Sequence, residues 1–378
     1  MHISHAEIRC VRLPLVHGFQ TSSHRKKSLD HLVVTLHGEN GYMGWGEIAS
    51  ASHPFYNPET TETCWSIATA ELLPLIVGRT WNSAEQASGA WNKVRGNHFA
   101  KAGVEMALWD LQARLEHRSV ADLLGGTRST VAAGVSLGIE PSIGELLDQV
   151  ALQLEAGYTR VKLKVAPGWD VTPVSAVRRE FGDIDLHVDA NASFSEIPAH
   201  LGVLHELDGL GLTMIEQPFA PENLLAHARL QQQIETPICL DESVESLASL
   251  ETALSIDACR VLNIKVSRMG GLGAARAAHD LAVSAGIPVW CGGMHEFGIG
   301  RAANIAISSL PGFTLTSDVS ASEKYYARDI LTRPITADRG IVEVPVGDGL
   351  GYDVDLVFLA ENTLRIQTLE PATSPTAA

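Results

Sequence analysis

The chain of 378 residues is poor in cysteine, and its basic residues are far outnumbered by acidic ones. Its five cysteines, Cys10, Cys64, Cys239, Cys259 and Cys291, form no CxxC pair, which argues against a disulfide framework and against a thiolate zinc site. Lysine and arginine number 28 against 44 aspartates and glutamates, so the formal net charge is −16. Because nucleic acids and anionic membranes bind to basic surfaces, we expect neither as a partner.

Signals for export or membrane insertion are also missing. The first residues, MHISHAEIRCVRLPLV, lack the basic region and long apolar run of a signal peptide, and no apolar stretch is long enough to span a bilayer. Scattered cysteines suit a reducing compartment, so a cytoplasmic location is expected. A hydrophobic content of 45% supports a sizeable globular core.

The middle of the chain repeats a short apolar run followed by an amphipathic helical stretch. Eight runs begin at residues 131, 160, 186, 212, 237, 260, 287 and 313, so the starts lie 23 to 29 residues apart. This spacing is what one strand, one helix and two loops occupy. The pattern predicts an α/β fold, a closed (β/α)8 TIM barrel with its functional groups at the C-terminal ends of the strands. A doubly wound open sheet is the alternative, but no GxGxxG follows the first strand.

The two ends of the chain have a different pattern. Residues 1–50 alternate as strands, with GENG as the turn of a predicted hairpin, and residues 97–117 have helical periodicity. Beyond residue 325, the segments GIVEVPV and NTLRIQT are strand-like again. The ends therefore predict a mixed α+β unit beside the barrel.

We expect this unit to be a capping domain formed by residues 1–128 and completed by residues 325–378. The catalytic barrel is then assigned to residues 129–324. Residues 16–28 are expected to form a loop that could close over the mouth of the barrel.

Charged residues stand at the C-terminal ends of five consecutive predicted strands: Lys164, Asp189, Glu216, Asp241 and Lys265. The three carboxylates converge, and their mutual repulsion would raise their pKa values unless a cation lies among them. Ligands that offer only oxygen atoms favour a hard divalent ion, Mg²⁺ or Mn²⁺. The sequence therefore predicts a metal site in the barrel mouth.

Lys164 and Lys265 end strands two and six, which lie opposite each other in a ring of eight. This arrangement suits removal of a proton from the carbon next to a substrate carboxylate. The substrate carboxylate would bind the metal, whose charge stabilises the enediolate that forms. A lysine would be the base, and the like charge of Lys162, one inward position below Lys164, would lower the pKa of Lys164.

The motifs KLK, DAN, EQP, DES and NIK at these spacings resemble the enolase superfamily. Within it, the segments GYTRVKLKVAPGWDVTPVSAVRREFGDIDLHVDAN, TPICLDES and IPVWCGGM are similar to the o-succinylbenzoate synthase and N-acylamino acid racemase family of the muconate-lactonizing subgroup. The likeness includes GNHFAKAGVEMALWD in the predicted cap and covers nearly the whole chain.

The resemblance implies Asp189, Glu216 and Asp241 as metal ligands, Lys164 as the base and Lys265 on the other face of the substrate. In o-succinylbenzoate synthesis, Lys164 would take the α-proton and assist loss of the hydroxyl group, while Lys265 stabilises the enediolate. In racemisation both lysines would exchange protons. A homo-oligomer is also expected. The family suggests substrate contacts from Ser136, Phe19, Tyr56, Gly293, Met294, Ser320 and Tyr325.

Four further polar residues lie near these positions. Asn191 and Asn263 share the inward orientation of Asp189 and Lys265, and they are expected to hydrogen-bond to the ligands rather than to the substrate. Glu242 either supports Asp241 or is solvated. His295 either contacts the substrate or packs within its loop.

The chain departs from the family pattern in two places. HEFG follows CGGM, so His295 and Phe297 change the acyl pocket and leave the substrate open. The eighth strand ends SDVSAS, without the DxD of dipeptide epimerases, which disfavours an enzyme that binds a substrate ammonium group. Dehydration and racemisation share metal, bases and intermediate. Both therefore stay open, as does another cycloisomerase or epimerase of the subgroup.

Other classes of protein explain fewer of these residues. A barrel glycoside hydrolase would use Glu216 and Glu296, but it leaves Asp189, Asp241 and both lysines unexplained. A Schiff-base aldolase needs one lysine and has no use for three convergent carboxylates. A barrel that only binds or regulates would not need the reactive series.

Overall fold

Seven parallel strands form one curved sheet in the order β13-β12-β11-β10-β9-β8-β7. The computed structural model describes residues 1–20 and 25–371, and of residues 19, 20, 25 and 26 it describes the backbone alone. The strands of this sheet are β7 (Val135–Leu137), β8 (Arg160–Lys164), β9 (Asp185–Asp189), β10 (Ile215–Glu216), β11 (Ile238–Leu240), β12 (Val261–Ile264) and β13 (Val289–Cys291).

The eighth segment of the barrel is held by a few hydrogen bonds and has no regular strand. On one side, Asp318 N donates to Cys291 O at 2.7 Å, beside β13, and on the other Gly134 N donates to Ser317 O at 2.8 Å, beside β7. The ring of eight units is thereby closed, and the predicted TIM barrel is confirmed. The first predicted run is divided, because β6 (Thr130–Ala132) turns away and pairs with β14 (Ile341–Glu343).

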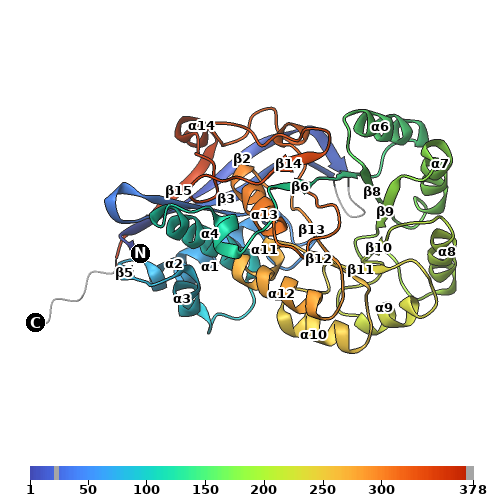
Figure 1. The fold of residues 1–378 in the computed structure, drawn as a ribbon, viewed down its shortest axis with the longest axis horizontal. Helices are drawn as coiled ribbons and strands as arrows, with labels where there is room; N and C mark the ends of the chain where they lie inside the picture. Colours follow the sequence, from blue (N-terminus) through green and yellow to red (C-terminus); the bar gives the residue numbers. More distant parts are fainter. Residues whose placement is uncertain (21–24, 372–378) are drawn as a thin grey trace, which may run out of the picture.

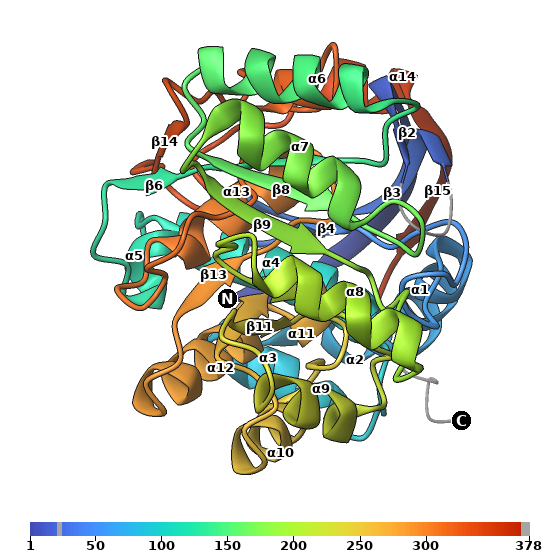
Figure 2. The ribbon, with the colours of Figure 1, turned by 90° about the vertical axis from the view of Figure 1, so that its right-hand side faces the viewer.

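Helices on the outer side of the sheet connect the strands, as Figures 1 and 2 show. Several begin at a residue that caps free N–H groups of the first turn: the side chain of Ser142 accepts from Glu145 N, and that of Ser246 accepts from Ser249 N. The helices are α6 (Ile143–Glu155), α7 (Val171–Phe181), α8 (Pro198–Asp208), α9 (Leu224–Gln231), α10 (Leu247–Ser255), α11 (Val266–Met269), α12 (Leu272–Ser284) and α13 (Gly298–Ser308).

The cap is built on a four-stranded antiparallel sheet in the order β15-β2-β3-β4, and Figure 1 shows β15 beside β2 although the two come from opposite ends of the chain. Its strands are β2 (His5–Gln20), β3 (Arg25–His37), β4 (Met43–Ile48) and β15 (Thr363–Leu369). The C-terminal segment therefore returns to complete the cap, as predicted. The domain boundaries at residues 128 and 325 stay a prediction.

Helix α4 (His98–Leu115) packs closely on this sheet. The approach depends on glycine, because a Cβ atom on Gly46 would lie 1.9 Å from Gly103 O. The smaller elements of the cap and its return are β1 (His2–Ile3), β5 (Arg79–Thr80), α1 (Thr61–Ile67), the π-helix η2 (Ala68–Leu72), α2 (Leu73–Ile76), α3 (Ala84–Ser88), α5 (Val120–Leu124), α14 (Leu356–Glu361) and the 3₁₀ turns η1 (Glu39–Gly41), η3 (Gly89–Trp91) and η4 (Ser322–Lys324).

Strands β2 and β3 of the cap extend into a segment that was predicted to be a loop. Two parts of the expected loop at 16–28 are wrong, because residues 16–20 belong to β2 and residues 25–28 to β3, with Phe19 paired to Lys26. Backbone pairing does not require apolar side chains, so the polar composition of this segment concealed it. Residues 21–24 lie outside the described residues. The predicted turn at GENG is confirmed between β3 and β4. Among the described residues, no helix combines the length and apolar content of a membrane span.

Candidate active site

The three predicted ligands meet at the C-terminal ends of neighbouring strands. Asp189 ends β9, Glu216 ends β10 in register with it, and Asp241 directly follows β11. One carboxylate oxygen from each lies within 4.8 Å of the others, and each residue is 0% exposed. The arrangement follows from the parallel register, which brings the ends of consecutive strands to one edge of the barrel.

Three lysines bind these carboxylates. Lys164 Nζ lies 2.6 Å from Asp189 Oδ2, and Lys265 Nζ lies 2.8 Å from Asp241 Oδ2. Lys162 Nζ, deeper in the barrel, lies 2.9 Å from Asp189 Oδ2 and 2.7 Å from Glu216 Oε2. Lys164 and Lys265 therefore stand at opposite ends of the arc of three acids, which we call the acid arc.

Burial and charge act differently on each member of the acid arc. Burial and the charge of Asp189 raise the pKa of Glu216 to about 7. Burial also acts to raise the pKa of Asp241, but the charges of Lys265 and Arg268 outweigh it and leave the value at about 2. Burial alone would lower the pKa of Lys265, yet Asp241 holds it above its usual value. Among the three acids, Glu216 is therefore the one whose negative charge is least offset by nearby positive charge.

This donor set fits a divalent cation. Asp189, Glu216 and Asp241 offer only carboxylate oxygens, which hard cations prefer. A cation among them would favour the ionised form of Glu216, whose pKa is now raised by burial and by Asp189.

The predicted supporting residues lie against the acids and Lys164. Asn191 Oδ1 accepts from Lys164 Nζ at 2.7 Å, and Asn191 Nδ2 donates to Glu242 Oε1 at 3.0 Å. Asn263 Nδ2 donates to Glu216 Oε1 at 2.8 Å. Burial and the charge of Asp241 raise the pKa of Glu242 to about 8.

Two of the predicted substrate contacts hydrogen-bond to acids of the barrel. Tyr56, from the cap, donates to Asp241 Oδ1 at 2.7 Å, and its hydroxyl lies 3.2 Å from Lys265 Nζ. Ser136, on β7, donates to Asp318 Oδ2 at 3.1 Å. The side chain of Phe19, also predicted to contact substrate, lies outside the described residues.

The other predicted substrate contacts follow β13 and the eighth segment of the barrel. Gly293, Met294 and His295 follow β13, and the His295 ring stacks on the Tyr325 ring with centroids 4.8 Å apart. The Ser320 hydroxyl is 3.5 Å from the Tyr325 hydroxyl. His295 and Ser320 therefore meet at Tyr325, which follows the eighth segment of the barrel.

Arg268 is a site residue that the sequence did not reveal. It is 2% exposed, its Nη1 bonds to Asp241 Oδ1, and its Nε donates to Val244 O at 2.7 Å. The only signal was its place three residues after Lys265, which α11 turns to the same side.

Asp318 was also missed. It accepts from Arg160 Nη2 at 2.6 Å and lies 3.6 Å from Lys162 Nζ. Burial acts against ionisation, but the charge of Arg160 and Lys162 holds the pKa of Asp318 well below its usual value. The available signal was the place of Asp318 at the end of the eighth predicted strand run.

Glu296, the second carboxylate of the glycosidase alternative, holds its own loop. Its Oε1 accepts from Met294 N and from Asn304 Nδ2, both at 2.9 Å, and the residue is 4% exposed. These hydrogen bonds give Glu296 a structural role in its loop.

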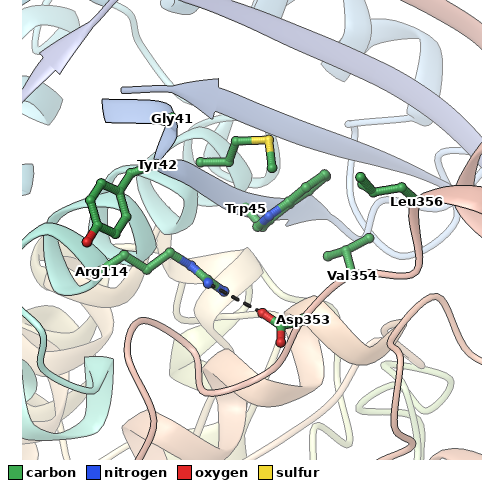
Figure 3. A pocket seen from close by; sticks show the side chains of 8 residues that line it. Gly41, Tyr42, Trp45, Arg114, Asp353, Val354 and Leu356 are labelled. Carbon is green, nitrogen blue, oxygen red and sulfur yellow. Dashed lines mark ion pairs between the residues drawn. The ribbon is translucent and has the colours of Figure 1, made fainter. Parts of the chain in front are cut away.

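A separate hollow of about 210 Å³ lies in the cap and is shown in Figure 3. Its one drawn ion pair joins Arg114 Nη1 and Asp353 Oδ1 at 3.7 Å. The acid arc is not part of its lining, which consists of Gly41, Tyr42, Met43, Trp45, Arg114, Asp353, Val354 and Leu356.

Comparison with known proteins accounts for both parts of the chain. Residues 145–357 match the enolase C-terminal domain-like family, and residues 4–125 match the mandelate racemase / muconate lactonizing enzyme N-terminal domain. An o-succinylbenzoate synthase of Geobacillus stearothermophilus is 41% identical over 94% of this chain and 94% of its own length. An N-succinylamino acid racemase of Amycolatopsis sp is 43% identical over 93% of this chain and 95% of its own length.

A solved structure supports the same family assignment. The crystal structure of an enolase superfamily member from Listeria innocua Clip11262 is similar with a TM-score of 0.94 and 38% identity, covering 98% of this chain and 99% of that one. The resemblance drawn from the strand-end motifs is thereby confirmed. The chain belongs to the enolase superfamily.

Proposed function

We propose that the chain is an enzyme that removes the proton from the carbon next to a substrate carboxylate. Its substrates are N-succinylamino acids, which it racemises, and 2-succinyl-6-hydroxy-2,4-cyclohexadiene-1-carboxylate, which it dehydrates to o-succinylbenzoate. The observation that carries the proposal is the placement of Lys164 and Lys265 at opposite ends of the acid arc. Relatives named for each activity align along nearly the whole chain, which supports both.

We infer that Asp189, Glu216 and Asp241 bind Mg²⁺ or Mn²⁺. The support is the donor set, three buried carboxylates with oxygens within 4.8 Å of one another. When bound, the cation supplies positive charge that stabilises negative charge developing on the substrate carboxylate.

Lys164 is the base, and it accepts the α-proton at Nζ. Asn191 Oδ1 at 2.7 Å orients this amine, and Asp189 Oδ2 at 2.6 Å stabilises the ammonium group that forms. In the dehydration, this ammonium returns a proton to the departing hydroxyl group, which leaves as water. Lys164 thus serves both steps on one face of the substrate.

Lys265 acts on the other face. Although burial lowers its pKa, the charge of Asp241 outweighs burial and keeps Lys265 protonated. In racemisation this ammonium donates a proton to the α-carbon on the face opposite Lys164. In the dehydration it stays charged and stabilises the negative intermediate.

Lys265→Ala is expected to reduce racemisation by roughly 10²- to 10⁴-fold, because no acid then remains on the second face. One enantiomer of an N-succinylamino acid is incubated in D2O and followed by proton NMR and chiral chromatography. The enantiomer whose α-proton faces Lys164 should still exchange, without forming its mirror image. Formation of the mirror image at the wild-type rate would contradict the role of Lys265.

Gly292→Ala is expected to weaken the binding of Mn²⁺ by about 10- to 100-fold, because it displaces Asn263, which hydrogen-bonds to the predicted ligand Glu216. A Cβ atom on Gly292 would lie 2.3 Å from Asn263 Oδ1, so Asn263 would move away from Glu216. Titration calorimetry measures the affinity. Gly202→Ala is the control, because its Cβ on α8 would meet no atom within 4 Å; equal affinities of the two variants would refute the expectation.

We further propose a cytoplasmic homo-oligomer, with the dehydration serving menaquinone biosynthesis. The five cysteines are all free and buried, which supports a reducing compartment.

A further inference from the structure

The loop that follows β13 is held by a carboxylate of the cap. Glu47, on β4, accepts from Phe297 N at 2.8 Å through Oε1 and from Gly300 N at 2.7 Å through Oε2. A Cβ atom on Gly300 would lie 2.8 Å from Glu296 Cγ and 3.0 Å from Glu47 Oε2, so glycine makes room for both side chains. One side chain of the cap thus fixes both the end of the loop and the start of α13.

His31, on the neighbouring strand β3, completes this contact. Its Nδ1 lies 2.7 Å from Glu47 Oε1, and its ring lies 4.6 Å from the Phe297 ring. His31 is 1% exposed and Glu47 is 0% exposed. A buried carboxylate needs donors on its oxygens. His31 therefore orients Glu47 toward the loop.

Tyr325 and Tyr326, which follow the eighth segment of the barrel, hold the other side of the loop. The Tyr326 hydroxyl donates to His295 O, and its ring packs edge-on against the Phe297 ring at 5.3 Å. The Tyr325 ring stacks on His295. His295 itself has a φ of 60°, a left-handed conformation that a residue with a side chain keeps only when its surroundings hold it.

We propose that the His31–Glu47 pair is a positioning device by which the cap sets the conformation of residues 293–297, and with it the side-chain preference of the enzyme. The inference rests on the proposed function and on the prediction that the loop after β13, with Gly293, Met294 and His295, contacts the substrate. The lysines that move the proton and the acid arc lie at the ends of other strands. Loss of the pair therefore changes substrate binding and selectivity while leaving the chemical step in place.

His31→Phe tests this directly. Phenylalanine keeps an aromatic ring against Phe297 but removes the donor to Glu47. His279→Phe is the matched control, since the buried His279 ring also lies against a phenylalanine ring, that of Phe313 at 5.3 Å, and its Nε2 accepts a hydrogen bond from Gly312 N at 3.0 Å. His31→Gln is the rescue variant, because its amide can donate to Glu47.

The measurement is kcat and KM for N-succinylamino acids with small and with bulky side chains, together with the pH profile of kcat. His31→Phe should raise KM by about tenfold, the equivalent of one lost hydrogen bond to a charged group. It should also reorder the substrates, while kcat and its pH profile stay as in the wild type. His279→Phe should match the wild type, and His31→Gln should recover most of the loss. An unchanged substrate order, or equal loss in kcat for every substrate, overturns the proposal.

Amide hydrogen exchange separates this inference from the proposed function. The Phe297 and Gly300 amides, which donate to Glu47, should exchange faster in His31→Phe than in the wild type and in His279→Phe. Slow exchange in His31→Phe overturns the positioning role whether or not the enzyme turns over. A wild type that converts none of the substrates refutes the proposed function alone.

Discussion

Lys164→Ala is expected to lower kcat for both racemisation and dehydration by roughly 10³- to 10⁴-fold, the upper part of what a positioned base contributes. Both reactions begin when Nζ of Lys164 accepts the α-proton, so neither can bypass its loss. Lys164→Arg should be equally inactive, since arginine keeps the charge but does not deprotonate. Chiral chromatography follows racemisation, and absorbance of the aromatic product follows dehydration.

Lys93→Ala is the matched control for this variant. Lys93 is an exposed residue of the cap, so its replacement should leave both rates unchanged. A Lys164→Ala enzyme that retained a tenth or more of wild-type turnover would show that another group is the base.

Chelation of divalent cations is expected to reduce turnover by roughly 10³-fold, because stabilisation of the developing charge by a metal is worth several kcal/mol. Mg²⁺ or Mn²⁺ should restore the rate in the wild type. Glu216→Gln should not be restored, since the middle ligand of the acid arc has lost its charge. The assay is turnover after EDTA treatment and dialysis against each metal.

The apo form of Glu216→Gln should remain folded, which separates loss of metal from loss of structure. Burial and Asp189 raise the pKa of Glu216 to about 7, and Lys162 keeps its ion pair with Asp189 at 2.9 Å, so a neutral amide at position 216 is expected to leave the apo protein folded. Glu206→Gln, an exposed change on α8, is the control. EDTA-resistant turnover would contradict a metal site, and borohydride trapping would then test a Schiff base.

The barrel and the acid arc could be predicted because they depend on local periodicity. Alternation places Lys162 and Lys164 on the inner face of β8, and the strand spacing brings Asp189 and Glu216 to adjacent strand ends. Neither inference needs knowledge of how distant segments pack.

Contacts between the cap and the barrel could not be predicted in the same way. Tyr56 meets Asp241 across 185 residues of sequence, and Glu47 meets Phe297 N across 250. The sequence marks Glu47 only as one acid in a strand, with no periodic signal. The same limit applies to the parts of the expected 16–28 loop that belong to β2 and β3, because these strands are joined by backbone pairing, which polar side chains do not indicate.

The sequence by itself determined that eight strand and helix units carry three acids and their lysines at the strand ends, because strand period and unit length are local properties of the chain. Only the tertiary structure decided which cap residues reach that site, how Arg268 and Asp318 hold it, and how the His31–Glu47 pair holds the loop after β13. Those contacts depend on how segments that are far apart in the sequence pack together. A buried charge must be paired only once folding has removed it from water, so the pairing has no local signal in the sequence.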